Sequence, residues 1–389
     1  MEVSTGPLVD PYRAEWEIPF EDRDNSVISV MPGESDKVFH DPIIGRPVKW
    51  EQDVYCTTCS IKDGRIVCVY RAFGDDEQWR MGLGWSDDGV HFDLEDQPVF
   101  HARPEDDFLG GLRSLGDVSV SYGDSRLVAT EDGRYCLYFN YFSCGVHPRQ
   151  ELAVASTTDF RTWTMHGRAF ARVAKSDDQV IPEHAPWRFP HPGVVTRLQD
   201  DKLVAARIGG KYFMYLNCLS TVGHECLCAA TSDNLVDWEI VRDPAGALVH
   251  PMPLRPGRFD SWYIDTAAAV VRSDGILLVY NGINADPATD GDPQLLRSAH
   301  YPAQALFDLN DPTRLIARSE TPFRGGDTDL EQKPIVFWVA PLYESWSLVP
   351  WRSDLLLYWN HAFGRRSVGV WKGPIGSNLR GIADSGASE

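Results

Sequence analysis

Hydrophobic and polar positions along this chain alternate in short runs, as is typical of β-strands. One pattern recurs five times: a polar turn, then alternating aromatic and aliphatic residues, then a closing Tyr, Phe or Asn. The copies are DGRIVCVYR (63–71), DGRYCLYFN (132–140), GGKYFMYLN (209–217), DGILLVYNG (274–282) and SDLLLYWNH (353–361). A spacing of roughly 65 to 80 residues lets them cover nearly the whole chain, which indicates a repeat architecture.

A second motif follows the first three copies at similar offsets. It reads GWSDDGVHFD (84–93), ASTTDFRTWT (155–164) and ATSDNLVDWEI (230–240). Each is a strand that ends in Ser or Thr, a tight turn rich in Asp, Asn or Gly, and an aromatic residue that opens the next strand. This composition predicts β-hairpins, and no long helical periodicity lies between the copies.

Repeat units of this size, made of several short strands without a helix, favour the blades of a β-propeller over a sandwich. We therefore expect an all-β fold, a five-bladed β-propeller that forms a single domain. Residues 1–50 are expected to complete a blade or cap one end, residues 51–375 to form the propeller, and residues 376–389 to be a flexible tail.

The composition of the chain limits the classes of molecule that it is expected to bind. The formal net charge of −19 repels phosphate backbones and anionic lipid, so neither nucleic acid nor a membrane surface is an expected partner. The first residues lack a basic patch followed by an apolar run, so we expect no signal peptide and a cytoplasmic location. The CxxC of Cys56 and Cys59 and the CxC of Cys226 and Cys228 lack His or Cys partners at zinc spacing. We expect reduced thiols, no metal and no cofactor.

Several stretches resemble glycoside hydrolase family 130. They are YRAF (70–73), SDDGVHF (86–92), GDSRLVATEDGRYCLYF (123–139), ARIGGKYFMYLN (206–217), DTAAAVVRSDGILLVYNG (265–282) and LLLYWNHAFGRRSVGV (355–370). The resemblance implies a five-bladed propeller that acts on β-mannosides, as a phosphorylase or as a hydrolase. Related propeller glycosidases of the arabinanase and fructosidase groups share several of these stretches.

The chain also departs from the family pattern. A family Glu-Asp-Pro-Arg is 123–126 here, reading Gly-Asp-Ser-Arg, and a family Pro-Glu is replaced by Ala205 and Ala206. The family's Tyr-His-Gly is 280–282 here, with Asn281 in the place of His. Because phosphorolysis in the family draws on basic residues near such places, these changes favour hydrolysis.

Cleavage of a glycosidic bond with inversion needs one carboxylic acid and one carboxylate base. The resemblance assigns the proton donor to Asp124, although Arg126 beside it would favour the ionised form. Asp265 lies in the apolar run WYIDTAAAVV, where a carboxylate needs partners, and is expected to be a base or a substrate ligand. Glu331, Glu183 and Asp53 are further carboxylates that could be catalytic, and each could instead be a solvated loop residue.

Substrate-binding residues are expected among polar groups at strand ends: Arg71, Arg126, Arg149, His191, Asn281 and His361, with Asn284 as a further candidate. Arg149 matches the place of an Arg that family phosphorylases use near phosphate, and a surface role is its alternative. Trp187, Trp262 and Trp346 could stack on sugar rings or pack between blades.

The sequence therefore predicts an enzyme that cleaves an oligosaccharide or glycoside, a β-mannoside or a related sugar, by hydrolysis. One alternative is a phosphorylase that uses inorganic phosphate and releases a sugar 1-phosphate. Another is a propeller that binds sugar or protein without catalysis. The sequence has no nucleophile elbow, phosphate loop or dinucleotide fingerprint that would favour another chemistry.

Overall fold

The structure is a computed structural model of the 389-residue chain. It describes residues 14–29, 33–106, 119–144, 149–170, 191–219, 225–324, 343–361 and 367–380. Within these ranges the regular structure is β-strand, apart from one short helix, α2 (Ser377–Arg380). The prediction of an all-β fold is confirmed. No helix of the described ranges has the length and apolar character that crossing a bilayer would require.

The first repeat copy lies in a four-stranded antiparallel sheet with the order β4-β5-β6-β7. Its strands are β4 (Asp53–Lys62), β5 (Arg65–Phe73), β6 (Trp79–Ser86) and β7 (Asp93–Leu94). Asp63 and Gly64 form the turn between β4 and β5 with φ angles of 51° and 74°. Because Asp and Gly tolerate the left-handed region, this pair permits the tight hairpin that the repeat predicts.

Three further copies lie in a 14-stranded sheet. It begins with β8 (Ser119–Ala129), β9 (Tyr135–Cys144), β10 (Arg149–Thr157) and β11 (Thr164–Arg168). It continues with β12 (Gly193–Gln199), β13 (Lys202–Ala205), β14 (Arg207–Ile208), β15 (Lys211–Leu219), β16 (Glu225–Ser232) and β17 (Trp238–Ile240). It ends with β18 (Tyr263–Arg272), β19 (Gly275–Ile283), β20 (His300–Phe307) and β21 (Leu315–Arg318). Short parallel contacts join these antiparallel sets, such as Val204 with Ala129.

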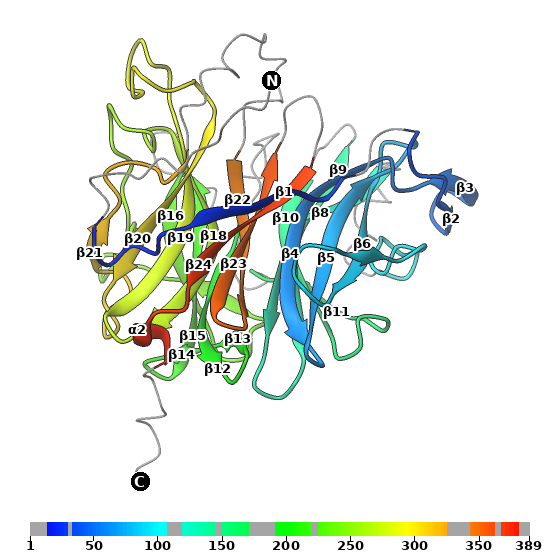
Figure 1. Ribbon diagram of the computed structural model, residues 1–389, viewed down its shortest axis with the longest axis horizontal. Helices are drawn as coiled ribbons and strands as arrows, with labels where there is room; N and C mark the ends of the chain where they lie inside the picture. The colour runs from blue at the N-terminus through cyan, green and yellow to red at the C-terminus, as the bar shows by residue number, and fades with distance from the viewer. Residues whose placement is uncertain are drawn as a thin grey trace.

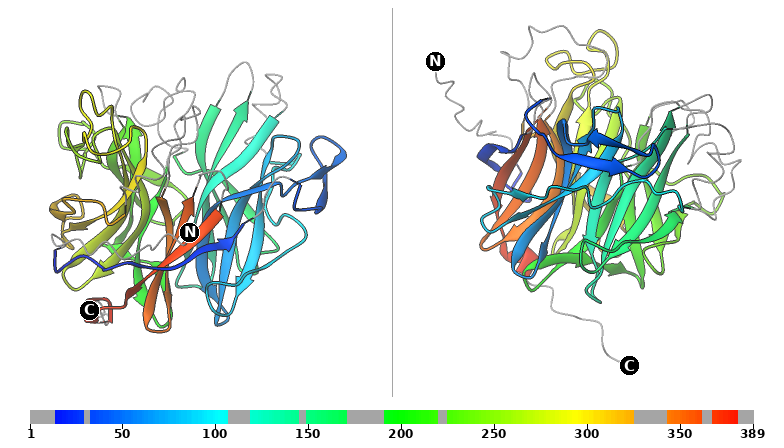
Figure 2. Two further views of the ribbon diagram at one scale, coloured as in Figure 1. Left: turned by 45° about the horizontal axis from the view of Figure 1, so that its top comes forward. Right: turned by 90° about the vertical axis from the view of Figure 1, so that its right-hand side faces the viewer.

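The last copy lies in a four-stranded sheet that contains both ends of the described chain. Its order is β1 (Glu21–Ile28), β24 (Ser367–Pro374), β23 (Asp354–His361) and β22 (Tyr343–Trp351). β1 runs antiparallel to β24, with Glu21 opposite Lys372, and the two strands lie side by side in Figure 1. The backbone pairings of the described strands do not join all the sheets into one closed sheet. A separate hairpin of β2 (Val38–Asp41) and β3 (Arg46–Lys49) projects beyond the larger sheets (Figures 1 and 2).

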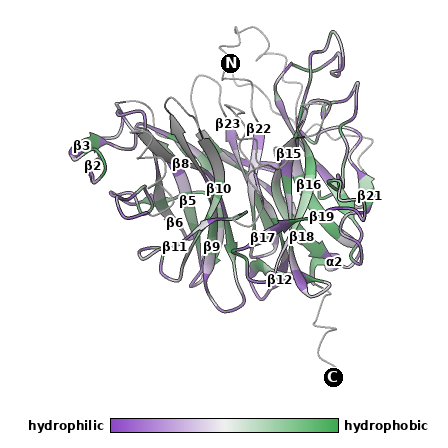
Figure 3. Cartoon of the chain, turned by 180° about the vertical axis from the view of Figure 1, so that it is seen from behind, coloured by the Kyte–Doolittle hydropathy of each residue, from purple (hydrophilic) through white to green (hydrophobic). Residues whose placement is uncertain are grey.

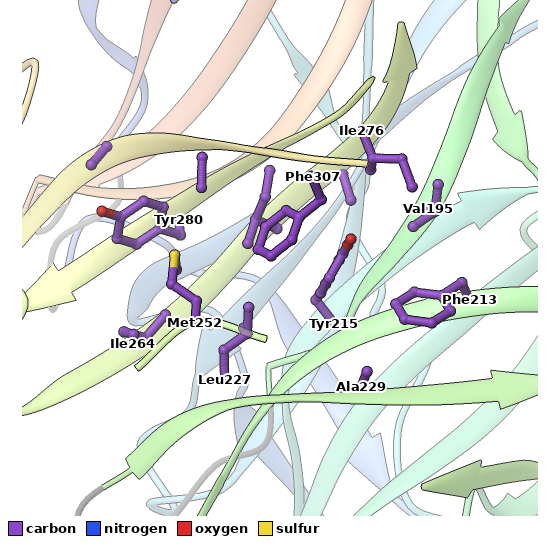
Figure 4. Close-up of a cluster of buried hydrophobic side chains, with 14 of the residues drawn as sticks. Val195, Phe213, Tyr215, Leu227, Ala229, Met252, Ile264, Ile276, Tyr280 and Phe307 are labelled. Atoms are coloured by element: carbon purple, nitrogen blue, oxygen red, sulfur yellow. The ribbon is translucent and has the colours of Figure 1, made fainter. Parts of the chain in front are cut away.

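The five repeat copies form the corresponding strands β5, β9, β15, β19 and β23, each the second strand of its antiparallel set. Their apolar residues face cores on both sides of the sheets, and Figure 3 shows apolar strands joined by more hydrophilic connections. One core lies between neighbouring sets, where the rings of Tyr215 and Phe307 have centroids 4.7 Å apart (Figure 4). Packing of apolar faces between sets therefore stabilises the fold where few backbone pairs join them.

The first strands of four sets carry a β-bulge. The register shifts lie between Tyr55 and Thr57 in β4, Gly123 and Arg126 in β8, Thr266 and Ala268 in β18, and Ser345 and Ser347 in β22. A bulge inserts an unpaired residue and re-aims the side chains around it, and bulges are common beside active sites. The same four strands, with β12, line a cavity of about 50 Å³ that contains Arg126 and Trp346 at its wall. The strands that carry the bulges therefore meet around one cavity.

Candidate active site

Asp124 lies at the bulge of β8 and is almost fully buried, with 4% of its surface exposed. Its Oδ1 accepts a hydrogen bond from Arg71 Nη1 at 2.5 Å, and Arg71 comes from the first repeat strand, β5. The Cys56 thiol, from the bulge of β4, donates to the same oxygen at 3.2 Å. Burial raises the pKa of the Cys56 thiol, so the thiol keeps the proton that it donates.

The backbone at this contact is strained on both sides. Asp124 has a φ of 41° and Cys56 a φ of 54°, so both adopt the left-handed conformation that residues with a Cβ rarely occupy. Such residues cost roughly 1–3 kcal/mol each and gather at functional sites. The Arg71 guanidinium is in turn held between two rings, 4.7 Å from the centroid of Tyr55 and 4.0 Å from that of Trp79. The pair is therefore fixed by its surroundings.

Asp265 is completely buried on β18, as the apolar run around it predicts. His191 Nδ1 lies 2.9 Å from its Oδ1, and Asn281 Nδ2 donates to its Oδ2 at 3.3 Å. Arg126 Nη2 lies 3.7 Å from Oδ1. Burial opposes ionisation, but the positive charges of His191 and Arg126 outweigh it and hold the pKa of Asp265 at about 2. Asp265 is therefore an anion throughout the neutral range.

Glu344, on β22, is a third buried carboxyl group that the sequence reasoning missed. The Tyr55 hydroxyl donates to its Oε2 at 2.9 Å, and His300 Nδ1 lies 3.8 Å from its Oε1. Burial, together with the negative charges of Asp265 and Asp124, raises the pKa of Glu344 well above its usual value. A hydrogen bond between Glu344 and Asp265 acts in the same direction, so the two groups form a carboxyl dyad that shares one proton.

Arg126 and Trp346 pack against each other beside these carboxyl groups. The Arg126 guanidinium stacks 3.8 Å from the centroid of the Trp346 ring and donates to the carbonyl oxygen of Thr266 at 2.7 Å. Trp346 is 1% exposed, and its indole N–H donates to the carbonyl oxygen of Ser125 at 3.1 Å. The Trp346 ring therefore stacks on Arg126 and has no exposed face on which a sugar could stack.

Six of the predicted site residues come together here: Asp124, Asp265, Arg71, Arg126, His191 and Asn281. Others do not join them. Asn284 binds the backbone of Asp292 and Leu295 in its own loop, and Trp262 is 44% exposed outside the cluster. Glu331, Glu183 and Trp187 lie outside the described residues, and only the backbones of Arg149 and His361 are described. Their predicted roles stay predictions.

The missed Glu344 and the predicted Asp265 share a signal. Glu344 lies opposite Asn360, the next-to-last residue of the fifth repeat, as Asp265 lies opposite Asn281, the next-to-last residue of the fourth. The strand that precedes each repeat copy could therefore have been searched for a carboxylate at this register. His300 begins β20, and burial lowers its pKa to about 4, so its imidazole is neutral near pH 7.

Three potential cation ligands also meet in the cluster. His191, Asp265 and Glu344 each offer a ligand atom, and these atoms lie within 4.8 Å of one another. Nitrogen and carboxylate ligands at such separations suit a divalent ion. The Arg126 guanidinium, 3.7 Å from Asp265, would oppose a second positive charge there.

Comparisons with known proteins identify the family of the chain. The profile of glycoside hydrolase family 130, described as β-1,4-mannooligosaccharide phosphorylase, matches residues 40–332. A solved structure of a protein assigned as a glycoside hydrolase from Parabacteroides distasonis has 31% identity and a TM-score of 0.72, over 91% of this chain and 96% of that chain. Another, from work on family members that target β-1,2-mannosidic linkages in Candida mannan, has 28% identity and a TM-score of 0.75, over 92% and 95%.

A curated relative is more distant. The β-1,2-mannobiose phosphorylase of Listeria innocua is 24% identical over 251 residues, which are 63% of this chain and 64% of the relative. The match therefore spans somewhat less than two thirds of that enzyme's length. On the profile match and the similarity along nearly its whole length to solved members, the chain belongs to glycoside hydrolase family 130.

Proposed function

We propose that this protein hydrolyses β-mannosidic bonds with inversion at the centre formed by Asp124, Asp265 and Glu344. The observation that supports it is the pair of opposite shifts within the dyad: the pKa of Asp265 is held at about 2 while that of Glu344 is raised. The dyad therefore holds one proton and can take up a second, as a general base requires. The family match supports a mannoside as substrate, and the relative that targets β-1,2 linkages makes β-1,2-mannobiose the first to test.

In this mechanism Asp124 protonates the glycosidic oxygen, as the family resemblance implies. Arg71 at 2.5 Å favours the ionised form of a carboxylate, so the substrate must weaken that contact for Asp124 to hold a proton. A sugar hydroxyl that accepts from Arg71 would do so. The Cys56 thiol also hydrogen-bonds the Asp124 carboxyl group and would keep it oriented.

The dyad of Glu344 and Asp265 acts as the base. Glu344 keeps a little exposure, 4%, whereas Asp265 has none, so Glu344 is the member that water can reach. As Glu344 accepts a proton from the attacking water it passes its own proton to Asp265, and the dyad changes from one proton to two. The water oxygen bonds to the anomeric carbon while the leaving oxygen takes the proton of Asp124, so the charges balance.

Phosphorolysis is the alternative that the curated relative's activity favours. Among the described residues, however, each basic side chain at the centre already faces a carboxylate: Arg71 faces Asp124, and His191 and Arg126 face Asp265. A phosphate dianion would lie against these carboxylates without a surplus of positive charge to hold it. This pattern supports water as the nucleophile.

The deciding experiment incubates the protein with β-1,2-mannobiose or β-1,4-mannobiose, with and without inorganic phosphate. We expect free mannose at a rate that phosphate does not change, and the first-formed anomer, followed by NMR, to be the α form. Mannose 1-phosphate that appears only with phosphate would establish the phosphorylase instead. Binding without any product would indicate a platform without catalysis.

We also infer that the five antiparallel sets are the blades of one propeller. Side-chain contacts run from each of three sets to the next: Arg71 to Asp124, Asn281 to Ser345, and Asn360 to Cys56. The last contact runs from the final set back to the first, as a ring requires. The pairing of β1 with β24 supports the prediction that residues 1–50 complete a blade. A crystal structure with five blades around one axis is the expected result, and any other number would reject the inference.

A further inference from the structure

A second group of reactive side chains lies apart from the catalytic centre, where β16 meets the loop after β17. Cys226 and Cys228 project from one face of β16, and the exposed His250 reaches them from that loop. His250 Nδ1 lies 3.0 Å from the Cys226 sulfur and 3.6 Å from the Cys228 sulfur. All three potential ligand atoms lie within 4.8 Å of one another.

The fold brings these residues together. Residues two apart on a strand share a face, so the CxC motif aims both sulfurs the same way. A backbone contact between Arg242 and Leu248 folds the loop on itself, and a second between Leu227 of β16 and Met252 brings it back beside β16. Figure 4 shows Leu227 and Met252 side by side. His250 lies between these anchors and is therefore carried to the cysteines, 22 residues after Cys228 in the sequence.

The donor set has the chemistry of a zinc site. Zn²⁺ prefers thiolate and imidazole ligands in a tetrahedron, with bonds of about 2.3 Å to sulfur and 2.0–2.1 Å to nitrogen, so neighbouring ligand atoms lie roughly 3.5–3.8 Å apart. The distance from His250 Nδ1 to the Cys228 sulfur, 3.6 Å, lies in that range. The distance to the Cys226 sulfur, 3.0 Å, is shorter, and a small side-chain movement would lengthen it. Cys218 pairs directly with Cys226 in the register of β15 and β16, so a third cysteine lies at the same level of the sheet.

Cys228 is disulfide-bonded in this structure, so its sulfur cannot bind a metal in this state. We propose that Cys226, Cys228 and His250 form a redox-dependent Zn²⁺ site, which binds the ion once the disulfide at Cys228 is reduced. With a phosphine as reductant, the S–S bond breaks into two thiols while the phosphine takes the oxygen of one water and becomes its oxide. Zinc then binds the two thiolates and the imidazole, and the thiol protons leave to solvent.

The bound ion would fasten the loop of residues 241–252 to β16. β15, the neighbour of β16, carries Asn217, which accepts from the His191 backbone N–H at 2.6 Å and donates to the Tyr263 hydroxyl at 2.6 Å. Asn217 lies opposite Leu227, between the two cysteines in the register of β15 and β16, so zinc bound to Cys226 and Cys228 would stabilise the strand that holds Asn217.

The test titrates the full-length protein with Zn²⁺ under anaerobic conditions, before and after reduction by a water-soluble phosphine. We expect one Zn²⁺ per reduced chain, a higher melting temperature when it is bound, and no binding to the oxidised protein. Co²⁺ in place of Zn²⁺ should give the near-ultraviolet absorption of thiolate ligation and the visible bands of a tetrahedral ion.

His250→Asn changes an exposed residue and should weaken binding about tenfold or more, because one of three ligands is lost. His91→Asn, at another exposed histidine, is the matched control and should bind as the unchanged protein does. Zinc binding that is absent after reduction, that is equal in the oxidised protein, or that His250→Asn leaves unaltered would overturn the proposal.

Discussion

Arg71 and Asp124 lie on different antiparallel sets, 53 residues apart in the sequence, and their side chains meet at 2.5 Å in the interior. Arg71 is the last polar residue of the first repeat strand. At the same place in the second to fifth repeats the chain has Asn140, Asn217, Asn281 and Asn360, all of them buried. The first repeat thus carries a cation where the others carry an amide, and that cation faces the carboxylate to which we assign proton donation.

Replacing Arg71 by Gln should damage both folding and activity. Asp124 would remain buried with no cation beside it, and breaking one partner of a buried ion pair costs about 3–5 kcal/mol. Denaturant unfolding measures this loss. Arg65→Gln is the control on the same strand, because Arg65 pairs with Asp87 at the surface and such pairs contribute about 0–1 kcal/mol. Equal losses in the two variants would contradict a special role for the Arg71 contact.

Much of the fold could be predicted because the repeat is encoded locally. Asp-Gly and Gly-Gly turns and alternating apolar residues specify each hairpin, and β5, β9, β15, β19 and β23 form where the copies lie. The site was harder to predict. At a bulge the strict alternation of side chains is broken, so the pattern around Trp346 does not reveal that Glu344 faces the centre.

Two further features could not be read from the sequence. Asp265 was found because a carboxylate in an apolar run needs partners, but nothing local shows that those partners are His191 and Arg126, 74 and 139 residues away. Likewise, Cys226 and Cys228 have no histidine at zinc spacing, and only the return of the loop to β16 brings His250 beside them. Both depend on contacts between distant segments.

The dyad predicts a pH-dependent difference in stability between the unchanged protein and Glu344→Gln. The pKa of Glu344 is raised in the folded state, so its contribution is fully present below the unfolded pKa of about 4.3 and is lost as pH rises toward the folded pKa. Gln does not titrate, and its amide can accept from Tyr55 and donate to Asp265. From about pH 5 to pH 8 an unfolded Glu is ionised. Over this span the melting temperature of the unchanged protein should therefore fall relative to that of the variant. A constant difference over this span would show that Glu344 is already ionised.

Asp265 predicts the opposite sign at low pH. Its folded pKa of about 2 lies below the unfolded value of about 3.9, so it contributes stability above that value which is lost as pH falls toward 2. Asp265→Asn removes this dependence, and its unfolding free energy should vary less between about pH 4 and 2 than that of the unchanged protein. Asp308→Asn is a comparison at the surface, where hydrogen bonds from two backbone N–H groups also lower the pKa of an aspartate. Identical acid curves for Asp265→Asn and the unchanged protein would rule out the ionised, buried Asp265.

The assigned roles of Asp124 and Glu344 can be separated by the leaving group. Asp124→Asn should lower kcat on mannobiose about 10²–10⁴-fold, the usual contribution of a proton donor, but should affect 4-nitrophenyl β-mannoside much less, because nitrophenolate leaves without a proton. Glu344→Gln should lose activity on both substrates, and azide should restore part of it by replacing the activated water. If Glu344→Gln alone spared the nitrophenyl substrate, the proton donor would be Glu344, and the roles of the two groups would be reversed.

The contact between Asn360 and Cys56 carries the last prediction. Asn360 is fully buried, and its side-chain oxygen accepts the backbone N–H of Cys56, the strained residue whose thiol donates to Asp124. Asn360→Ala would leave that N–H unsatisfied, at a cost of about 1–3 kcal/mol, and would let Cys56 relax. We therefore expect a loss of stability together with a lower kcat, measured by denaturant unfolding and by mannose release. Asn310→Ala in an exposed turn should change neither, and full activity in a destabilised Asn360→Ala would show that the contact between the last set and the first supports the fold without positioning Asp124.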